Sequence, residues 1–130
     1  MEPEDVVHVL HNMVDAVKPG GLVFDLQVIR PNPTIESNGK VVCEIDGEPL
    51  FRRADAATAA IDALTQSNEL VEQAVDDHVV RNHYANGPEL IDDFTGKQRR
   101  LPEHALPHLS ALLQPCVVHE RCRLRRLQVH

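Results

Sequence analysis

Two polar side chains, Asp25 and Gln27, interrupt an apolar segment and are the strongest candidates for a functional site. In a strand, alternate residues point to the same face, so these two side chains would share one face of a sheet. A carboxylate in a buried strand needs a partner, because an unpaired buried charge is strongly destabilising. Two interpretations stay open: Asp25 contacts a substrate or another small ligand, or it caps a neighbouring element or is simply exposed.

Two pairs of histidines have spacings that place both imidazoles on one face of a helix. His8 and His11 are three residues apart, and His104 and His108 are four apart. A metal site needs a third or fourth ligand, and no cysteine or acidic residue shows a recognisable spacing with either pair. We therefore expect solvated surface histidines and assign no metal ligand.

The sequence lacks the motifs that mark common catalytic centres. It contains no Gly-x-Ser-x-Gly elbow, no glycine-rich phosphate loop and no His-Glu-x-x-His pair. Cys43 has no evident histidine partner that would activate it as a nucleophile. We therefore assign no catalytic or cofactor-binding residue.

The chain is acidic, with a net charge of −7, which argues against nucleic acid or an anionic membrane surface as a partner. A local basic strip near the C-terminus departs from this balance. We expect its arginines to pair with carboxylates of the protein itself, or of an acidic neighbouring subunit, rather than with nucleic acid. The strip consists of Arg121, Arg123, Arg125 and Arg126.

Three cysteines and the absence of an apolar leader bear on the cellular compartment. No stretch approaches the ~20 apolar residues of a membrane span, and the acidic N-terminal residues are unlike a secretory signal. Cys43, Cys116 and Cys122 are odd in number, widely spaced and set in apolar runs. We expect buried thiols in a cytoplasmic protein, since stable disulfides belong to oxidising compartments.

The elements that must position these residues begin with a helix and a strand. The length of 130 residues predicts a single domain spanning 1–130. An amphipathic helix is expected from Pro3 to Val17, ended by the Lys-Pro-Gly-Gly segment at 18–21. A nearly continuous apolar strand follows from Leu22 to Ile29. The buried stripe of the helix would consist of Val6, Leu10, Met13, Val14 and Val17.

The middle of the chain is predicted to form a hairpin and a second helix. Residues 34–40 are expected to be a polar loop, and residues 41–51 a small hairpin around an Asp46-Gly47 turn. An alanine-rich helix is expected over residues 54–66. Its inner face would consist of Ala57, Ile61 and Leu64.

Among the remaining elements, the hydrophobic pattern of residues 71–84 is compatible with both a helix and a strand. For residues 71–84, periodicity alone favours a helix over a strand. Short helices are expected around residues 88–96 and between Pro102 and Pro115. Residues 116–129 are predicted to be a strand whose side chains alternate. On it Val118, Glu120, Cys122 and Leu124 would share one face, and Arg121, Arg123 and Arg125 the other.

The residues from Val9 to Leu26 resemble a late segment of class I S-adenosylmethionine-dependent methyltransferases. In that family a helix ends in Leu-Lys-Pro-Gly-Gly, and this segment leads into the fifth strand of the sheet. A helix, a sixth strand and an antiparallel seventh strand, inserted between the fifth and sixth, come next. The segments 54–66, 71–84 and 116–129 resemble these parts in order, which favours a strand for at least the second half of 71–84.

The resemblance implies an α/β fold: a small mixed sheet with packed helices, like the C-terminal half of a doubly wound methyltransferase domain. The family binds S-adenosylmethionine through a glycine-rich loop after its first strand and an acidic residue after its second. Neither has a counterpart in this sequence. The implied function is that of a methyltransferase-like protein that is truncated or non-catalytic on its own. The resemblance also places the end of the strand with Asp25 and Gln27 beside the substrate pocket.

Two other functions stay open: an enzyme or small-ligand-binding module with a pocket around Asp25 and Gln27, and a structural domain for dimerisation or partner binding. Without a fourth strand of the family fold, the strand from Leu22 to Ile29 would present an open apolar edge. No lysine or internal proline protects that edge. We therefore expect a homodimer that uses this edge, the first helix, or both.

Overall fold

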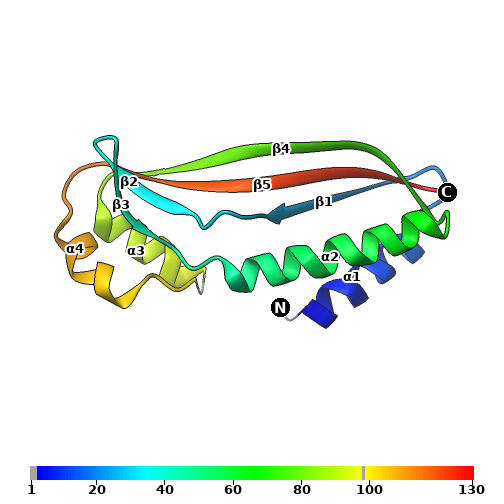
Figure 1. The fold of residues 1–130 in the computed structure, drawn as a ribbon, viewed down its shortest axis with the longest axis horizontal. Helices are drawn as coiled ribbons and strands as arrows, with labels where there is room; N and C mark the ends of the chain where they lie inside the picture. The colour runs from blue at the N-terminus through cyan, green and yellow to red at the C-terminus, as the bar shows by residue number, and fades with distance from the viewer. Residues whose placement is uncertain (1–2, 98) are drawn as a thin grey trace. The chain divides into compact units, whose positions relative to one another are not determined.

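The computed structural model describes residues 3–97 and 99–130 and has the α/β class that the sequence predicts (Figure 1). No helix in these residues is both long and apolar enough to cross a membrane. The elements in chain order are α1 (Pro3–Ala16), β1 (Leu22–Val28), β2 (Thr34–Ser37), β3 (Lys40–Glu44), α2 (Glu48–Gln66), β4 (Leu70–Tyr84), α3 (Gly87–Gly96), a 3₁₀ turn (Glu103–Ala105), α4 (Leu106–Ala111) and β5 (Cys116–Val129).

The strands form one five-stranded antiparallel sheet. The closing strand β5 pairs with β1 in a continuous register that places Leu22 opposite Gln128, and its first residues pair with β2. β4 pairs with β5 as well, and the hydrogen bond from His130 N to Glu69 O (3.1 Å) continues this antiparallel pairing. The expected mixed sheet is therefore wrong. β1 and β4 point the same way, but β5 runs between them in the opposite direction, so no parallel pair forms.

The chain divides into two compact units, and each unit has its own hydrophobic core. The first unit consists of the described parts of residues 1–29, 48–78 and 122–130. The second consists of the described parts of residues 30–47 and 79–121. Strands β4 and β5 therefore contribute residues to both units.

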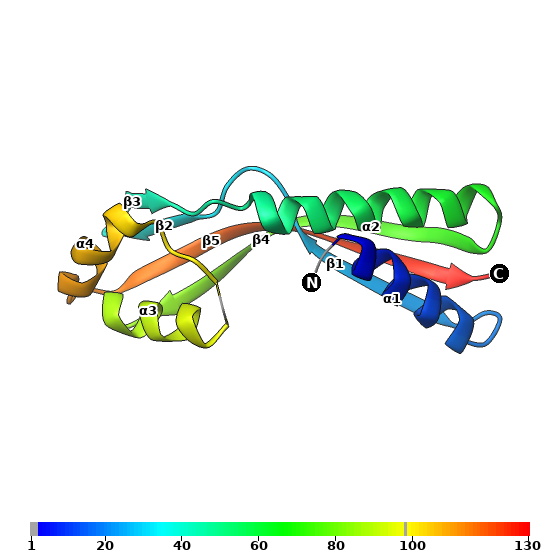
Figure 2. The ribbon, with the colours of Figure 1, turned by 90° about the horizontal axis from the view of Figure 1, so that it is seen from below.

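In the first unit, α1 and α2 lie side by side on one face of the sheet (Figure 2). Leu10 and Val14 of α1 belong to the same buried cluster as Val23 of β1 and Leu127 of β5. Met13 of the predicted stripe stays 41% exposed. The predicted inner face of α2, which consists of Ala57, Ile61 and Leu64, is buried and confirmed.

The turn between α1 and β1 depends on its two glycines. Gly20 has φ +84°, a conformation that side chains with a Cβ rarely adopt. A Cβ on Gly21 would lie 2.4 Å from Val17 Cγ1. Gly20 N donates to Val129 O at 2.7 Å, and Val129 N donates to Gly21 O at 2.8 Å. These bonds fasten the turn to the end of β5 and confirm the predicted boundary between helix and strand.

In the second unit, the hairpin lies earlier in the chain than predicted. β2 and β3 pair across Asn38-Gly39, where φ is +54° and +75°, as expected for a two-residue hairpin turn. The predicted hairpin at 41–51 is wrong, because only its first strand exists. Residues 48–51 begin α2 instead, and Pro49 suits a first helical turn since no helical partner awaits its nitrogen.

Helices α3 and α4 complete the second unit. The side chain of Asn86 accepts a hydrogen bond from Glu89 N (2.9 Å) and caps α3. The first residue of α3, Gly87, lies so close to α4 that a Cβ there would meet the carbonyl oxygen of Leu109. The core of this unit includes Ile35, Leu90, Phe94, Leu109 and Val118.

Residues 70–84 form a strand, so the helix favoured by periodicity is wrong and the strand favoured by the resemblance is observed. Val71, Val75 and Val79 recur every four residues, a spacing that fits both a helical stripe and one face of a strand. Their side chains stay between 40% and 48% exposed, so no buried helical stripe forms. Pairing with β5 instead satisfies the backbone of this segment.

The buried face of β5 changes phase along the strand. Val118, Glu120 and Cys122 are buried, as the predicted face requires. From Arg125 onward the odd-numbered residues are buried, and Arg125 is only 8% exposed whereas Leu124 is half-buried. The predicted faces are therefore wrong for Leu124 and Arg125, because strict alternation does not continue past Cys122.

Candidate functional site

The structure brings the two predicted site residues together on β1. Gln27 Nε2 donates a hydrogen bond to Asp25 Oδ1 at 2.8 Å, and both side chains are half-buried. Their common face is thus confirmed. The carboxylate has a partner on its own strand, which leaves its second oxygen to contact other groups.

Asp25 and Gln27 line a cavity of about 320 Å³ within the first unit. Its walls come from α1, from β1 and from the start of α2, where Arg53 and Ala57 contribute. The α1 wall is apolar and consists of Val6, Val9, Leu10 and Met13. No serine, cysteine or histidine lines this cavity, and Asp25 is the one carboxylate among its lining residues.

Arginines of the basic strip contact carboxylates other than Asp25. Arg125 lies opposite Asp25 in the register, but its guanidinium contacts Glu72 of β4 and, at 3.3 Å, Asp62 of α2. Arg123 holds Asp77 through hydrogen bonds of 2.8 and 3.0 Å, which raise the pKa of Arg123. The predicted pairing with the protein's own carboxylates is confirmed for these two arginines, while Arg121 and Arg126 are exposed.

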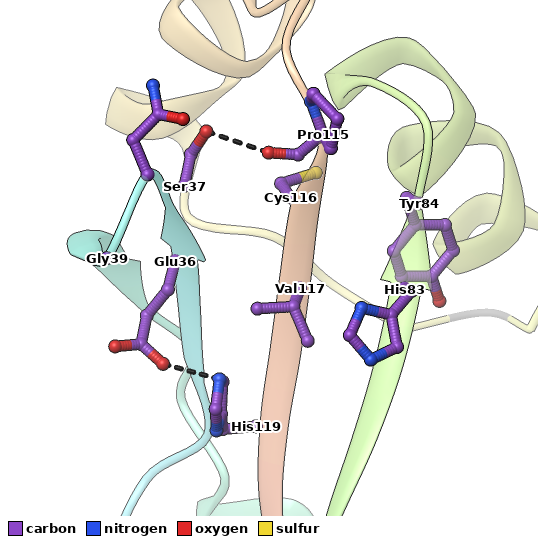
Figure 3. A pocket seen from close by; sticks show the side chains of 10 residues that line it. Glu36, Ser37, Gly39, His83, Tyr84, Pro115, Cys116, Val117 and His119 are labelled. Carbon is purple, nitrogen blue, oxygen red and sulfur yellow. Dashed lines mark hydrogen bonds and ion pairs between the residues drawn. The ribbon is translucent and has the colours of Figure 1, made fainter.

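A second cavity, of about 370 Å³, lies in the second unit (Figure 3). Glu36 of β2 and His119 of β5 contact each other in its wall, with Oε2 and Nε2 2.5 Å apart and each side chain about one quarter exposed. Val117 lies between this pair and His83 of β4. No signal in the sequence predicts this site, because only the register of β2 against β5 brings Glu36 and His119 together.

The rim of the second cavity is held by two contacts between the hairpin and the chain before β5. Ser37 Oγ donates to the carbonyl oxygen of Pro115 at 2.9 Å, as the dashed line in Figure 3 shows. Asn38 Nδ2 donates to Gln114 Oε1. The hairpin tip is therefore fixed without a ligand.

Tyr84 links the end of β4 to α3. Its hydroxyl donates to Asp93 Oδ2 at 2.5 Å, and Lys97 Nζ lies 3.0 Å from the same oxygen. Burial, together with this hydrogen bond, raises the pKa of Tyr84. The bonds from Tyr84 and Lys97 lower the pKa of Asp93. These groups hold two elements together, which is a structural role.

The predicted histidine pairs do not form a site. His8, His11, His104 and His108 are all exposed, as expected of surface histidines. Among residues 3–97 and 99–130, no group of three or more histidine, cysteine, aspartate or glutamate side chains is placed to hold a metal ion.

The three cysteines are buried thiols, which confirms the prediction. Burial raises the pKa of Cys43 and of Cys116 above the ordinary value of a thiol. A raised pKa keeps a thiol protonated and therefore a poor nucleophile. Neither of these two side chains is suited to covalent catalysis.

Comparisons with known proteins add no further constraint on these sites. No family model, no curated protein and no solved structure matches this chain. The chemistry of the two cavities and the order of the strands therefore carry the functional argument.

Proposed function

We propose that the chain is a methyltransferase-like half-domain that does not carry out catalysis with these residues alone. The observation that supports this most strongly is the strand order of the first unit, where β5 runs antiparallel between β1 and β4. In the family that the sequence resembles, the last strand is inserted in the same way between the two strands before it. α2 supplies the long crossover that connects two strands pointing in the same direction.

The proposal assigns no S-adenosylmethionine-binding residue to these 130 residues. Open α/β sheets bind such cofactors at loops after the carboxyl ends of their strands. The only adjacent glycines here, Gly20 and Gly21, instead close the turn between α1 and β1. In this account Asp25 and Gln27 belong to the substrate side of the sheet.

Equilibrium dialysis of the chain against labelled S-adenosylmethionine tests this part of the proposal. We expect no retention of the label at submillimolar concentrations, with adenosine as a matched control for weak binding of the nucleoside. Submillimolar binding by the chain alone would overturn the proposal.

We further propose that the free edge of β1 is where the protein associates, most simply with a second copy. Within the described residues β1 pairs only with β5, so its other edge is open. Leu22, Phe24 and Leu26 are 38%, 55% and 57% exposed. A two-fold pairing of β1 with its copy would satisfy the unpaired backbone groups and cover these side chains.

Strand β4, which pairs only with β5, also has an open edge, but charged side chains such as Glu72, Asp76 and Arg81 occur along it and protect it from pairing. The third strand with an open edge, β3, is also less suited to this role. It has five residues against the seven of β1. It begins with Lys40 and ends with Glu44, and charged side chains protect an edge from pairing. The apolar wall of α1 beside β1, with Val9 and Met13 exposed, extends the surface that a second copy would cover.

The distribution of charge leads us to propose a protein partner rather than nucleic acid. In the basic strip, Asp77 neutralises Arg123, and Glu72 neutralises Arg125. Arg121 and Arg126 remain exposed, too few to follow a phosphate backbone on a chain with a net charge of −7. We place the protein in a reducing cytoplasm, where buried thiols persist.

A small-ligand-binding module is the second candidate function, because a cavity does lie beside Asp25 and Gln27. This candidate predicts that a specific small molecule co-purifies with the protein and is lost in the Asp25→Ala variant. The half-domain proposal predicts that no such molecule is released on denaturation. Mass spectrometry of the released fraction separates the two.

A further inference from the structure

The cavity of the second unit carries one formal charge, and it is negative. Glu36 is the only carboxylate among its lining residues, and neither lysine nor arginine lines it. The partner of Glu36 is an imidazole, His119, and with histidines counted as neutral the wall keeps a net negative charge. Such a wall attracts a cation and repels a carboxylate.

The cavity also offers apolar surface and a suitable size. Val117 lies on its floor between the two sides, and the ring of Tyr84 contributes to its wall (Figure 3). Its volume of about 370 Å³ lies within the range of about 300–1,000 Å³ that is typical of small-molecule sites. A ligand with an apolar body and one polar group therefore fits better than a fully polar ion.

Hydrogen-bond acceptors lie on both sides of Val117. On one side, Oε2 of Glu36 contacts Nε2 of His119, which leaves Oε1 to accept a hydrogen bond from a ligand. On the other side lies the imidazole of His83, which is exposed. A primary ammonium group carries three donors, so it can donate to the second oxygen of Glu36.

We propose that this cavity binds a small molecule that carries a primary ammonium group on an apolar body. The hydrogen bond from Ser37 to Pro115 fixes the rim before any ligand arrives, and a preformed site loses less entropy on binding. This site lies in the second unit and depends neither on the methyltransferase resemblance nor on association through β1.

The chain provides its own reporter for this site. It contains one tyrosine and no tryptophan, and that tyrosine, Tyr84, lines the cavity. Three probes that do not absorb with tyrosine share one apolar ring: cyclohexylamine, cyclohexanol and cyclohexanecarboxylate. We expect a saturable change in tyrosine fluorescence with cyclohexylamine, about three- to tenfold weaker binding of cyclohexanol, and none of the carboxylate.

Two substitutions and one control complete the test. Glu36→Gln should weaken cyclohexylamine binding about fivefold to tenfold, since a charge-assisted hydrogen bond is lost. Val117→Phe fills the floor without removing the Glu36–His119 pair and should abolish binding. Glu44→Gln removes an exposed carboxylate of β3 outside the cavity and should change nothing.

The proposal is overturned if cyclohexanecarboxylate binds as tightly as cyclohexylamine, or if no probe binds at millimolar concentration. It is also overturned if Val117→Phe, with an unchanged melting temperature, leaves cyclohexylamine binding intact. Because Val117→Phe keeps the Glu36–His119 contact, this outcome remains informative even where Glu36→Gln disturbs the fold.

Discussion

Asp25 and Arg125 lie directly opposite each other in the antiparallel register of β1 and β5, yet the guanidinium of Arg125 contacts Glu72 and Asp62 instead. A cross-strand pair of opposite charges would ordinarily be the first partner available to a strand carboxylate. Asp25 instead accepts a hydrogen bond from Gln27. Asp25 therefore takes its hydrogen-bond partner from its own strand rather than from β5.

Arg125→Gln should lower the free energy of unfolding by about 1–3 kcal/mol, because the guanidinium is buried and bridges β5, β4 and α2. Arg126→Gln, the exposed neighbour on the same strand, should change it by less than about 0.5 kcal/mol. Urea denaturation of both variants measures the difference. Equal stabilities for the two variants would show that the network around Arg125 is not formed.

Asp25→Ala should keep the free energy of unfolding within about 1 kcal/mol of the parent, since only the bond from Gln27 is lost. Thermal melting followed by circular dichroism measures this directly. A larger loss would mean that Asp25 is a structural partner of the first unit rather than an available site residue.

Replacing Gly20 and Gly21 together by valine should destabilise the protein by about 1–3 kcal/mol. Gly20 has φ +84°, and a Cβ on Gly21 would lie 2.4 Å from Val17 Cγ1 and 2.9 Å from Lys18 O. Gly96→Ala is the matched control, because nothing lies within 4 Å of a Cβ there. An unchanged melting temperature for the double variant would place the end of α1 elsewhere.

The interactions of Asp93 should make stability depend on pH in the acidic range. Tyr84 and Lys97 lower the pKa of Asp93 below its ordinary value of 3.8, so the native state favours the carboxylate. The stabilisation is fully present above pH 3.8 and is lost as the pH falls through the lowered pKa of the folded state. The melting temperature of Asp93→Asn should lie below that of the parent at neutral pH, and the gap should narrow as the pH falls below 3.8.

The exposed neighbour Asp92 provides the control for this pH dependence. Asp92→Asn should follow the parent protein across the whole pH range. A gap between Asp93→Asn and the parent that stays constant from neutral to acidic pH would contradict the assigned role of the Tyr84–Asp93 hydrogen bond.

Local signals in the sequence predicted the elements whose ends are marked by strong backbone preferences. The glycines at 20 and 21 fixed where α1 stops and β1 starts, and Pro115 preceded the last strand. The hairpin was predicted around Asp46-Gly47, with residues 34–40 as a polar loop, but its turn forms at Asn38-Gly39. Both dipeptides favour a tight hairpin turn, so local preference does not rank them. The residues after Asp46-Gly47 begin α2 rather than a second strand. The local sequence around Pro49 does not show this, because the packing of α2 in the folded chain decides it.

Long-range pairing decided what local patterns could not. Residues 70–84 carry valines at a spacing compatible with helix and strand, and only the partner strand β5 settles the outcome. The burial of Arg125 depends on Glu72 and Asp62 from other elements. The Glu36–His119 pair depends on the register between β2 and β5. The shared face of Asp25 and Gln27 was predictable because the two residues lie two positions apart on one strand.

The proposed association through β1 depends on its second edge, which has no partner strand among the described residues. A matched pair of variants isolates that edge: Leu26 of β1 and Val41 of β3 are both 57% exposed. Leu26→Lys would place like charges close together across a two-fold β1 pair and should dissociate the dimer. Val41→Lys should leave it intact.

Static light scattering of the parent chain at micromolar concentration is the most direct measurement of this claim. The account predicts a mass twice the 14.5 kDa of one chain, falling to that of one chain in Leu26→Lys and unchanged in Val41→Lys. A monodisperse monomer of the parent protein would contradict the account, because the apolar edge of β1 would then be stable in water without a partner.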